Sequence, residues 1–180
     1  MTNRSVIRKR CAHGIRRAVL AAACATASLA LPAEAQAAFT GPGVYVISII
    51  DTNQVLDVEG NRVDLGQRLV RWGTNGGANQ KFIIFASPRG GYVMRPLHSL
   101  LCLDLPGWAT EVGVEPVQFH CTNADNQRFY FDPHERGYLI RTAHGGRILF
   151  APREGGRVRL AERPGAVSVG MVFHFQPVLP

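Results

Sequence analysis

The sequence predicts an all-β domain built from three copies of one repeat. A block containing Leu56-Asp57-Val58 and Asn79-Gln80-Lys81-Phe82 recurs as Leu103-Asp104-Leu105 and Asn126-Gln127-Arg128-Phe129. Both halves recur at a spacing of 47 residues, so the chain between them has the same length in each copy. Self-similarity at a fixed period marks a repeat architecture, in which one copy cannot bury its apolar face alone.

A third, more divergent copy follows the first two. Val44-Tyr45-Val46-Ile47 recurs as Gly91-Tyr92-Val93-Met94 and again as Gly137-Tyr138-Leu139-Ile140. The three predicted repeats are residues 43–89, 90–135 and 136–177. They fill one domain with almost nothing left over.

Each copy contains short aliphatic or aromatic stretches bounded by turn-forming clusters. The stretches include residues 44–48, 69–71, 82–84, 117–119, 129–131 and 158–160. Clusters such as Asn75-Gly76-Gly77 and Gly145-Gly146 separate them, which is typical of strands joined by tight turns. Four strands in each copy predict about twelve short strands in total.

Residues 1–37 have the layout of a secretory signal peptide. Basic residues are followed by an apolar run from Ala18 to Leu31 and then by Ala35-Gln36-Ala37. This order predicts export with cleavage after Ala37, and a mature domain of residues 38–180. A lipidated Cys24 is the alternative, but Ala21 is a poor residue three places before it. No later segment approaches the ~20 apolar residues of a membrane helix.

Removal of the leader changes the charge and the cysteine count. The chain has 20 Lys and Arg against 13 Asp and Glu, but the leader holds six of the basic residues and one acid, Glu34, which leaves 14 against 12. The high isoelectric point therefore does not indicate a nucleic-acid partner. Cys102 and Cys121 remain as an even pair in an oxidising compartment, and this predicts a disulfide. Such a bridge would contribute roughly 3 kcal/mol through loop closure.

With these residues the chain resembles the ricin B-type β-trefoil lectins, whose repeats end in a Gln-x-Trp motif. The resemblance covers residues 43–177, with Phe82 and Phe129 in place of the usual tryptophan. It implies a β-trefoil of three ~46-residue repeats. It also places Cys102 and Cys121 where family members have a disulfide within a repeat.

A sugar site needs a bidentate acceptor, an amide donor and a flat aromatic ring. The resemblance implies that the Asp accepts from adjacent ring hydroxyls, the Asn amide bonds to one of them, the aromatic ring stacks on the sugar face, and the Gln holds the local turn. The candidate carbohydrate-binding residues are Asp57, Trp72, Asn79 and Gln80 in copy one and Asp104, Phe119, Asn126 and Gln127 in copy two.

Structural roles are the alternative for the same positions. Asp57 and Asp104 could bond to backbone N–H groups of the turns that follow them. The two Asn-Gln pairs could pin hairpins. Trp72 precedes a polar loop, which favours an exposed ring over a core residue. Trp108 is a further loop aromatic that could extend the copy-two site.

The third copy lacks these residues and is rich in arginine. Phe150 stands at its Asp position, Leu160 at its aromatic position, and Gly170-Met171 at its Asn-Gln position. Residues 136–180 hold seven arginines against two acids. This pattern is typical of a solvated face, and the alternative is a docking surface for an acidic protein partner or an anionic glycan.

The sequence contains no phosphate-loop, dinucleotide or nucleophile-elbow motif, and its histidines match no metal-ligand spacing. Asp57 and Asp104 occupy equivalent places in different lobes, too far apart for a glycosidase pair. We therefore expect a secreted carbohydrate-binding protein without catalysis, cofactor or metal. Two other classes are a lectin-like subunit of a secreted toxin, resembling those of cytolethal distending toxin, and a β-trefoil protease inhibitor.

Overall fold

The computed structural model describes residues 38–154 and 156–179. The predicted leader and its cleavage site lie outside this part of the chain. Within the described residues the fold is all-β with twelve short strands, as the repeat pattern predicts. The strands are β1 (Gly43–Ile49), β2 (Gln54–Val58), β3 (Leu69–Gly73), β4 (Lys81–Ala86), β5 (Tyr92–Pro96), β6 (Cys102–Asp104), β7 (Val117–Phe119), β8 (Phe129–His134), β9 (Gly137–Thr142), β10 (Ile148–Phe150), β11 (Arg159–Ala161) and β12 (Phe173–Pro177).

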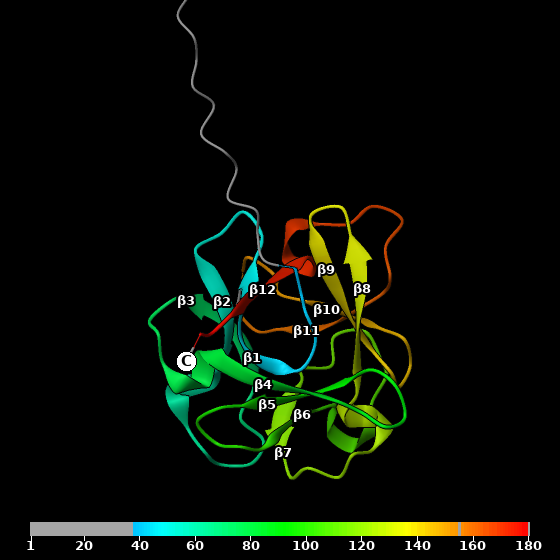
Figure 1. Cartoon of the computed structure of the whole chain (residues 1–180). Helices are drawn as coiled ribbons and strands as arrows, with labels where there is room; N and C mark the ends of the chain where they lie inside the picture. Colours follow the sequence, from blue (N-terminus) through cyan, green and yellow to red (C-terminus); the bar gives the residue numbers. More distant parts are fainter. Residues whose placement is uncertain (1–37, 155, 180) are drawn as a thin grey trace, which may run out of the picture. The chain divides into compact units, whose positions relative to one another are not determined.

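Six of the strands close into a ring of antiparallel pairs (Figure 1). β1 pairs with β4 and β12, β5 pairs with β4 and β8, and β9 pairs with β8 and β12. Each repeat contributes its first and fourth strands to this ring. The closed arrangement leaves none of these strands with a free edge along its whole length.

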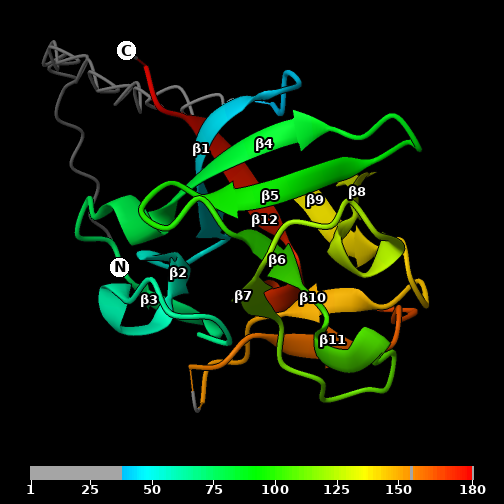
Figure 2. The ribbon, with the colours of Figure 1, turned by 90° about the horizontal axis from the view of Figure 1, so that it is seen from below.

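The other six strands form three hairpins, β2–β3, β6–β7 and β10–β11, one from each repeat (Figure 2). Backbone hydrogen bonds join every pair of repeats: Leu69 N to Pro116 O, Val158 N to Leu69 O, and Leu160 N to Val114 O. The hairpins therefore support one another in a closed triangle. Residues from different repeats become neighbours at each junction.

The core is built from the same positions in each repeat. Phe82, Phe129 and Phe173 begin or nearly begin the fourth strand of the three repeats, and all three are fully buried. Burial of a phenylalanine side chain contributes up to about 3 kcal/mol, so these rings are a large part of the driving force for assembly. The residues that recur in the three repeats of the sequence thus pack together in one core.

A short 3₁₀ turn precedes the fourth strand of each repeat. The turns are η2 (Ala78–Gln80), η4 (Asp125–Gln127) and η5 (Val169–Met171). Two other turns, η1 (Glu59–Asn61) and η3 (Pro106–Trp108), follow the Asp-bearing strands β2 and β6. The Asp and the Asn-Gln pair of repeats one and two lie on these adjoining elements. No helix in the described part of the chain is long and apolar enough to cross a membrane.

Strand register corrects one sequence assignment. The aromatic residue of repeat one, Trp72, pairs with Val55, and that of repeat two, Phe119, pairs with Cys102. The residue equivalent to Val55 and Cys102 in repeat three is Ile148, and it pairs with Ala161. The aromatic position of repeat three is therefore Ala161 rather than Leu160. Leu160 points into the core and is fully buried, because successive residues of a strand face opposite sides.

Candidate functional site

Three of the predicted residues of repeat one, Asp57, Trp72 and Asn79, line the same cavity, which has a volume of about 620 Å³. We call it the repeat-one cavity. Its walls come from β2, η1, β3 and the loop before η2, together with a segment of repeat three. The lining residues are Asp57, Glu59, Gly60, Asn61, Val70, Arg71, Trp72, Asn75, Gly77, Asn79, Gly156 and Arg157.

Only one of the two carboxylate oxygens of Asp57 accepts a hydrogen bond from the described part of the protein. It is 3% exposed, and its Oδ2 accepts a hydrogen bond from Gln80 Nε2 at 2.8 Å. No described residue donates to its Oδ1, which is not enclosed. The turn that follows it receives no side-chain cap, so the turn-capping role considered from the sequence is absent for Asp57. One oxygen is thus held and the other is free to accept from a ligand.

The Asn79-Gln80 pair has divided roles. Gln80 also donates from Nε2 to Gly73 O at 2.9 Å and accepts at Oε1 from Asn75 N at 2.8 Å. It therefore fastens the loop between β3 and η2 to the aspartate. Asn79 donates once, to Val58 O at 3.1 Å. An amide nitrogen carries two protons, and the second N–H of Asn79 lies near enough to the Asp57 carboxylate to lower its pKa, without the 3.0 Å bond that Asn126 makes to Asp104. Asn79 is therefore the more available of the two amides to a ligand.

Trp72 forms the apolar wall of the cavity and is 62% exposed. The expectation of an exposed ring rather than a core residue is met. Its neighbour Arg71 also lines the cavity but is buried. The polar loop after Trp72 leaves the ring open to solvent on the cavity side.

Repeat three completes the repeat-one cavity with Gly156 and Arg157, which no sequence motif assigns to it. An isolated bridge pairs Val70 with Arg157, and Arg71 N donates to Gly156 O at 2.6 Å. These contacts join positions more than eighty residues apart in the chain. No local pattern signals them, because they follow from the packing of hairpins around the threefold arrangement.

Burial raises the pKa of the Asp57 and Asp104 carboxyls above the usual value. In each case the loss of hydration outweighs the hydrogen-bond donors nearby, Gln80 and Asn79 in repeat one and Gln127 and Asn126 in repeat two. The charged form is thereby made less stable than in water. A ligand hydroxyl that bonds to either carboxylate would restore part of that lost hydration.

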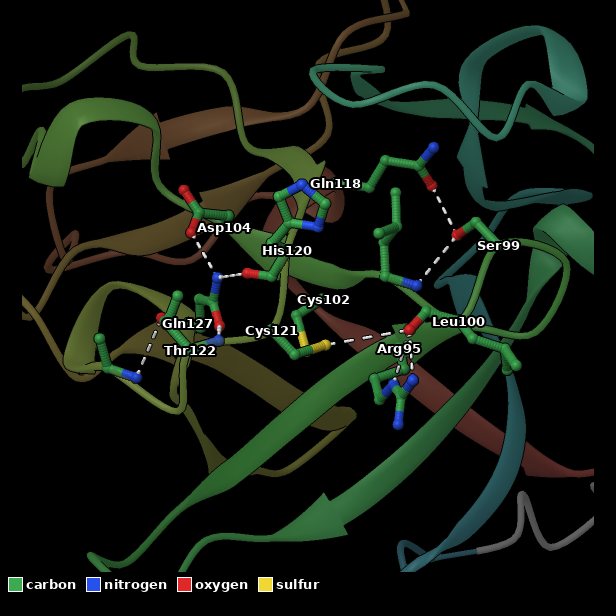
Figure 3. Close-up of a disulfide and its surroundings, with 12 residues drawn as sticks. Arg95, Ser99, Leu100, Cys102, Asp104, Gln118, His120, Cys121, Thr122 and Gln127 are labelled. Atoms are coloured by element: carbon green, nitrogen blue, oxygen red, sulfur yellow. Dashed lines mark hydrogen bonds between the residues drawn. A yellow bond between two sulfur atoms is a disulfide. The ribbon is translucent and has the colours of Figure 1, made fainter.

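Repeat two has a similar arrangement in which the amide of its Asn is more fully engaged. Figure 3 shows Gln127 bonded to Asp104 and to His120. Gln127 Nε2 donates to Asp104 Oδ2 and to His120 O, both at 2.7 Å. Asn126 Nδ2 donates to the same Oδ2 at 3.0 Å and to Leu105 O at 3.3 Å, so both of its protons are engaged. Its Oδ1 is buried without a partner. Asn126 is therefore less available to a ligand than Asn79.

The predicted disulfide between Cys102 and Cys121 is present beside this cluster (Figure 3). It ties β6 to the residue after His120, and so to the loop that Gln127 holds. The aromatic of this repeat, Phe119, is 42% exposed. Trp108 is 52% exposed and occupies the place that Asn61 has in repeat one, but its ring packs edge-on against His144.

Repeat three has no room for an amide at the equivalent place. A Cβ at Gly170 would lie 2.4 Å from Ala151 O and 2.8 Å from the Phe150 ring. Phe150 and the backbone thus fill the space that the Asp and Asn side chains occupy elsewhere. No cluster of three or more His, Cys, Asp or Glu side chains able to hold a metal ion occurs in residues 38–154 and 156–179.

Comparisons with known proteins agree with this architecture. Residues 36–119 match the model of the family described as ricin-type beta-trefoil lectin domain-like. No curated protein matches the chain in sequence.

Three solved structures illustrate the likeness in fold. The designed threefold-symmetric protein ThreeFoil has a TM-score of 0.70 at 22% identity, over 76% of this chain and 99% of its own. The Polyporus squamosus lectin, bound to a human-type influenza-binding epitope, has a TM-score of 0.69 at 19% identity, and the match covers 78% of this chain and 50% of the lectin. The Macrolepiota procera ricin B-like lectin, in complex with lactose, has a TM-score of 0.65 at 14% identity, and the match covers 79% of this chain and 100% of the lectin. These likenesses show that the fold is a β-trefoil.

Proposed function

We propose that the protein binds carbohydrate in the repeat-one cavity, on the premise that residues 36–119 match the ricin-type beta-trefoil lectin domain-like family. One observation carries the proposal: Asp57, Trp72 and Asn79 line the same cavity with a carboxylate acceptor, an amide donor and an exposed ring. These are the three groups that a sugar needs, since its hydroxyls both donate and accept while its C–H face is apolar.

The geometry supports binding rather than catalysis. Asp57 Oδ1 accepts from a sugar hydroxyl, Asn79 Nδ2 donates to an adjacent one, and the ring face lies on Trp72. Asp104, the other candidate carboxyl, does not line this cavity. Glu59, the second acid that does, lies 3.9 Å from Arg68 in an ion pair. An open site of this kind binds weakly, with a dissociation constant on the order of 0.1–1 mM.

Repeat two supplies a second and weaker site in this proposal. Asp104 retains a free Oδ1, but Asn126 has committed both of its amide protons. A ligand there loses about one hydrogen bond, which is worth roughly 1 kcal/mol. Two unequal sites on one rigid domain would still increase the avidity for a multivalent glycan surface.

A glycan array followed by calorimetric titration tests the proposal. We expect the variants Asp57→Ala and Trp72→Ala to weaken binding at least tenfold, because each removes one of the three groups. Asp104→Ala should weaken it less. The matched control is Asp64→Ala, since Asp64 is exposed, pairs with Arg62 and does not line the cavity. Absence of binding to every arrayed glycan, or unchanged binding by Asp57→Ala, would refute the proposal.

We also propose that the protein is exported and loses residues 1–37. The leader pattern of the sequence supports this, and so does the Cys102–Cys121 disulfide, because structural disulfides persist in oxidising compartments. The mass of the protein recovered from the culture medium of its native host should correspond to a chain that begins at Ala38. Recovery of the full-length chain from the cytoplasm alone would contradict export.

A further inference from the structure

Arg71 is a buried cation without an anionic partner. It is 5% exposed, and its Nε donates to Gln54 Oε1 at 2.6 Å while Nη1 donates to Ala151 O at 3.0 Å. None of the ion pairs among the described residues includes Arg71. Both of its acceptors are neutral, so its charge is solvated by the protein but not balanced.

Arg71 lies between two hollows of the surface. It lines the repeat-one cavity and also a second cavity of about 850 Å³ at the junction of repeats one and three. We call the latter the junction cavity. Its lining residues are Asp51, Thr52, Asn53, Gln54, Arg71, Phe150, Ala151, Arg153, Ser168, Val169 and Gly170. Arg71 is the one residue that lines both cavities.

The arginines of repeat three are mostly neutralised within the fold. Five of the seven pair with acids: Arg136, Arg141, Arg147, Arg157 and Arg163. Most of the positive charge of this repeat therefore lies in ion pairs within the domain. Arg153 and Arg159 have no carboxylate within ion-pair distance among the described residues, and only Arg153 lines the junction cavity.

The junction cavity consequently carries unbalanced positive charge. Burial lowers the pKa of the Arg71 guanidinium, and the positive charge of the exposed Arg153 nearby lowers it further. The one acid that lines the cavity, Asp51, is already paired with Arg136. Two like charges held beside one hollow repel each other, and an anion between them removes that cost.

We propose that the junction cavity binds the acidic group, a carboxylate or sulfate, of a saccharide whose neighbouring sugar occupies the repeat-one cavity. This inference rests on the proposed carbohydrate binding. Arg71 is the fixed member of the pair because its other hydrogen bonds lock it, and Arg153 is the mobile one that closes on the anion. A guanidinium suits either anion, because its planar donors match two oxygens at once.

The test uses arrayed disaccharides of glucose, galactose, mannose and N-acetylglucosamine, each in a neutral, a 6-sulfated and a 6-uronate form. The wild-type protein should bind at least one acidic form roughly tenfold more tightly than its neutral counterpart, as a charge-assisted contact provides. A preference for one acidic form assigns the anion as sulfate or carboxylate. Raising NaCl from about 50 to about 500 mM should reduce that preference and leave neutral binding unchanged.

The variant Arg153→Ser should lose the acidic preference, and we use it instead of an Arg71 variant because Arg153 is exposed and its replacement leaves the fold intact. The matched control is Arg163→Ser, an arginine of the same repeat that pairs with Asp132 and lines neither cavity. It should keep the preference.

The outcomes separate this inference from the proposed function. Equal binding of neutral and acidic forms overturns the junction cavity as an anion subsite and leaves carbohydrate binding intact. Retention of the acidic preference by Arg153→Ser does the same. Acidic binding that Asp57→Ala does not weaken would show an anion site unconnected to the repeat-one cavity, which contradicts the linked arrangement. Binding to no form refutes the proposed function itself.

Discussion

At the scale of single residues, two amides decide how each aspartate meets a ligand. In repeat one a single donor, Gln80, holds Asp57 Oδ2, while Asn79 bonds to a backbone carbonyl. In repeat two both amides converge on Asp104 Oδ2. The two motifs have the same letters but differ in how many polar groups remain free. Repeat one is the better candidate for this reason as well as for Trp72.

The raised pKa of Asp57 predicts that binding fails at a higher pH than for an ordinary carboxyl. Ligand hydroxyls donate to the carboxylate, so affinity should fall as pH drops through the raised pKa, above the usual value near 4. Folding has the opposite sign: burial favours the neutral acid, so this group's contribution to stability is present at low pH and is lost as pH rises through the folded pKa. Titration of a neutral saccharide between about pH 3.5 and pH 8 measures the first effect.

Asp57→Asn provides the control for this prediction. Asn keeps an oxygen for Gln80 Nε2 and removes the buried charge, so the free energy of unfolding at neutral pH should change by no more than about 1 kcal/mol. Residual binding by this variant should not depend on pH over the acidic range. A wild-type midpoint at or below the ordinary aspartate pKa would contradict the assignment of Asp57 as the acceptor.

At the scale of elements, the turn before the fourth strand holds the loop that shapes each site. Gln80 makes three hydrogen bonds that join η2, β3 and the aspartate, and Gln127 does the same in repeat two. Repeat two has a disulfide across the same loop and repeat one does not. The loop of repeat one has no covalent link and is held by hydrogen bonds, among which those of Gln80 are joined by Gly77 N to Asn75 Oδ1 and Thr74 N to Asn53 O.

Gln80→Ala should lower the free energy of unfolding by roughly 2–3 kcal/mol, since it leaves Asn75 N, Gly73 O and Asp57 Oδ2 without their partner. Amide hydrogen exchange should rise at residues 73–77. Gln127→Ala should disturb residues 120–124 less, because the disulfide still restrains them. The control is Gln176→Ala, an exposed glutamine on β12. Equal exchange in both loops would show that the disulfide adds no local order.

The sequence predicted the elements well where identical residues recur and less well where they do not. The twelve strands and the grouping of Asp57 with Trp72 and Asn79 follow from motifs repeated at one spacing, and the disulfide follows from the single pair of cysteines after the leader. The register of repeat three did not, because its hairpin is shorter and its markers are replaced, so Leu160 was assigned in place of Ala161. A pattern of residue types also could not predict which acceptor each Asn side-chain amide bonds to.

At the scale of the whole molecule, the repeats are not independent binding units. Arg157 and Gly156 of repeat three line the cavity of repeat one, and Gln118 of repeat two donates to Arg62 O and Asp64 O of repeat one. A site assigned to one repeat thus depends on the position of its neighbours. These contacts could not be predicted from the sequence, because they join residues with no shared motif across the junctions.

The open end of the six-strand ring is covered by a residue from outside the repeats. The ring of Phe39 lies 4.9 Å from the rings of Tyr92 and Phe131 and 5.1 Å from that of Phe175, centroid to centroid, and its backbone N donates to Tyr138 Oη at 3.2 Å. The ring of Tyr45 in repeat one lies 5.3 Å from that of Phe39, centroid to centroid, so the partners of Phe39 come from all three repeats. Phe39 therefore joins the three copies at a single point.

Phe39→Ala should destabilise the domain by about 2–4 kcal/mol, because it removes several edge-to-face contacts and opens a cavity among five aromatic rings. The urea midpoint should fall without a change in the slope, since the folded state stays compact. Phe39→Leu should recover part of the loss, and Phe85→Ala, which truncates an exposed ring, should cost little. If the leader is cleaved after Ala37, Phe39 is the second residue of the mature chain, so a shortened chain that starts at Thr40 should reproduce the Phe39→Ala loss. An unchanged midpoint for both would show that the three repeats hold together without this ring.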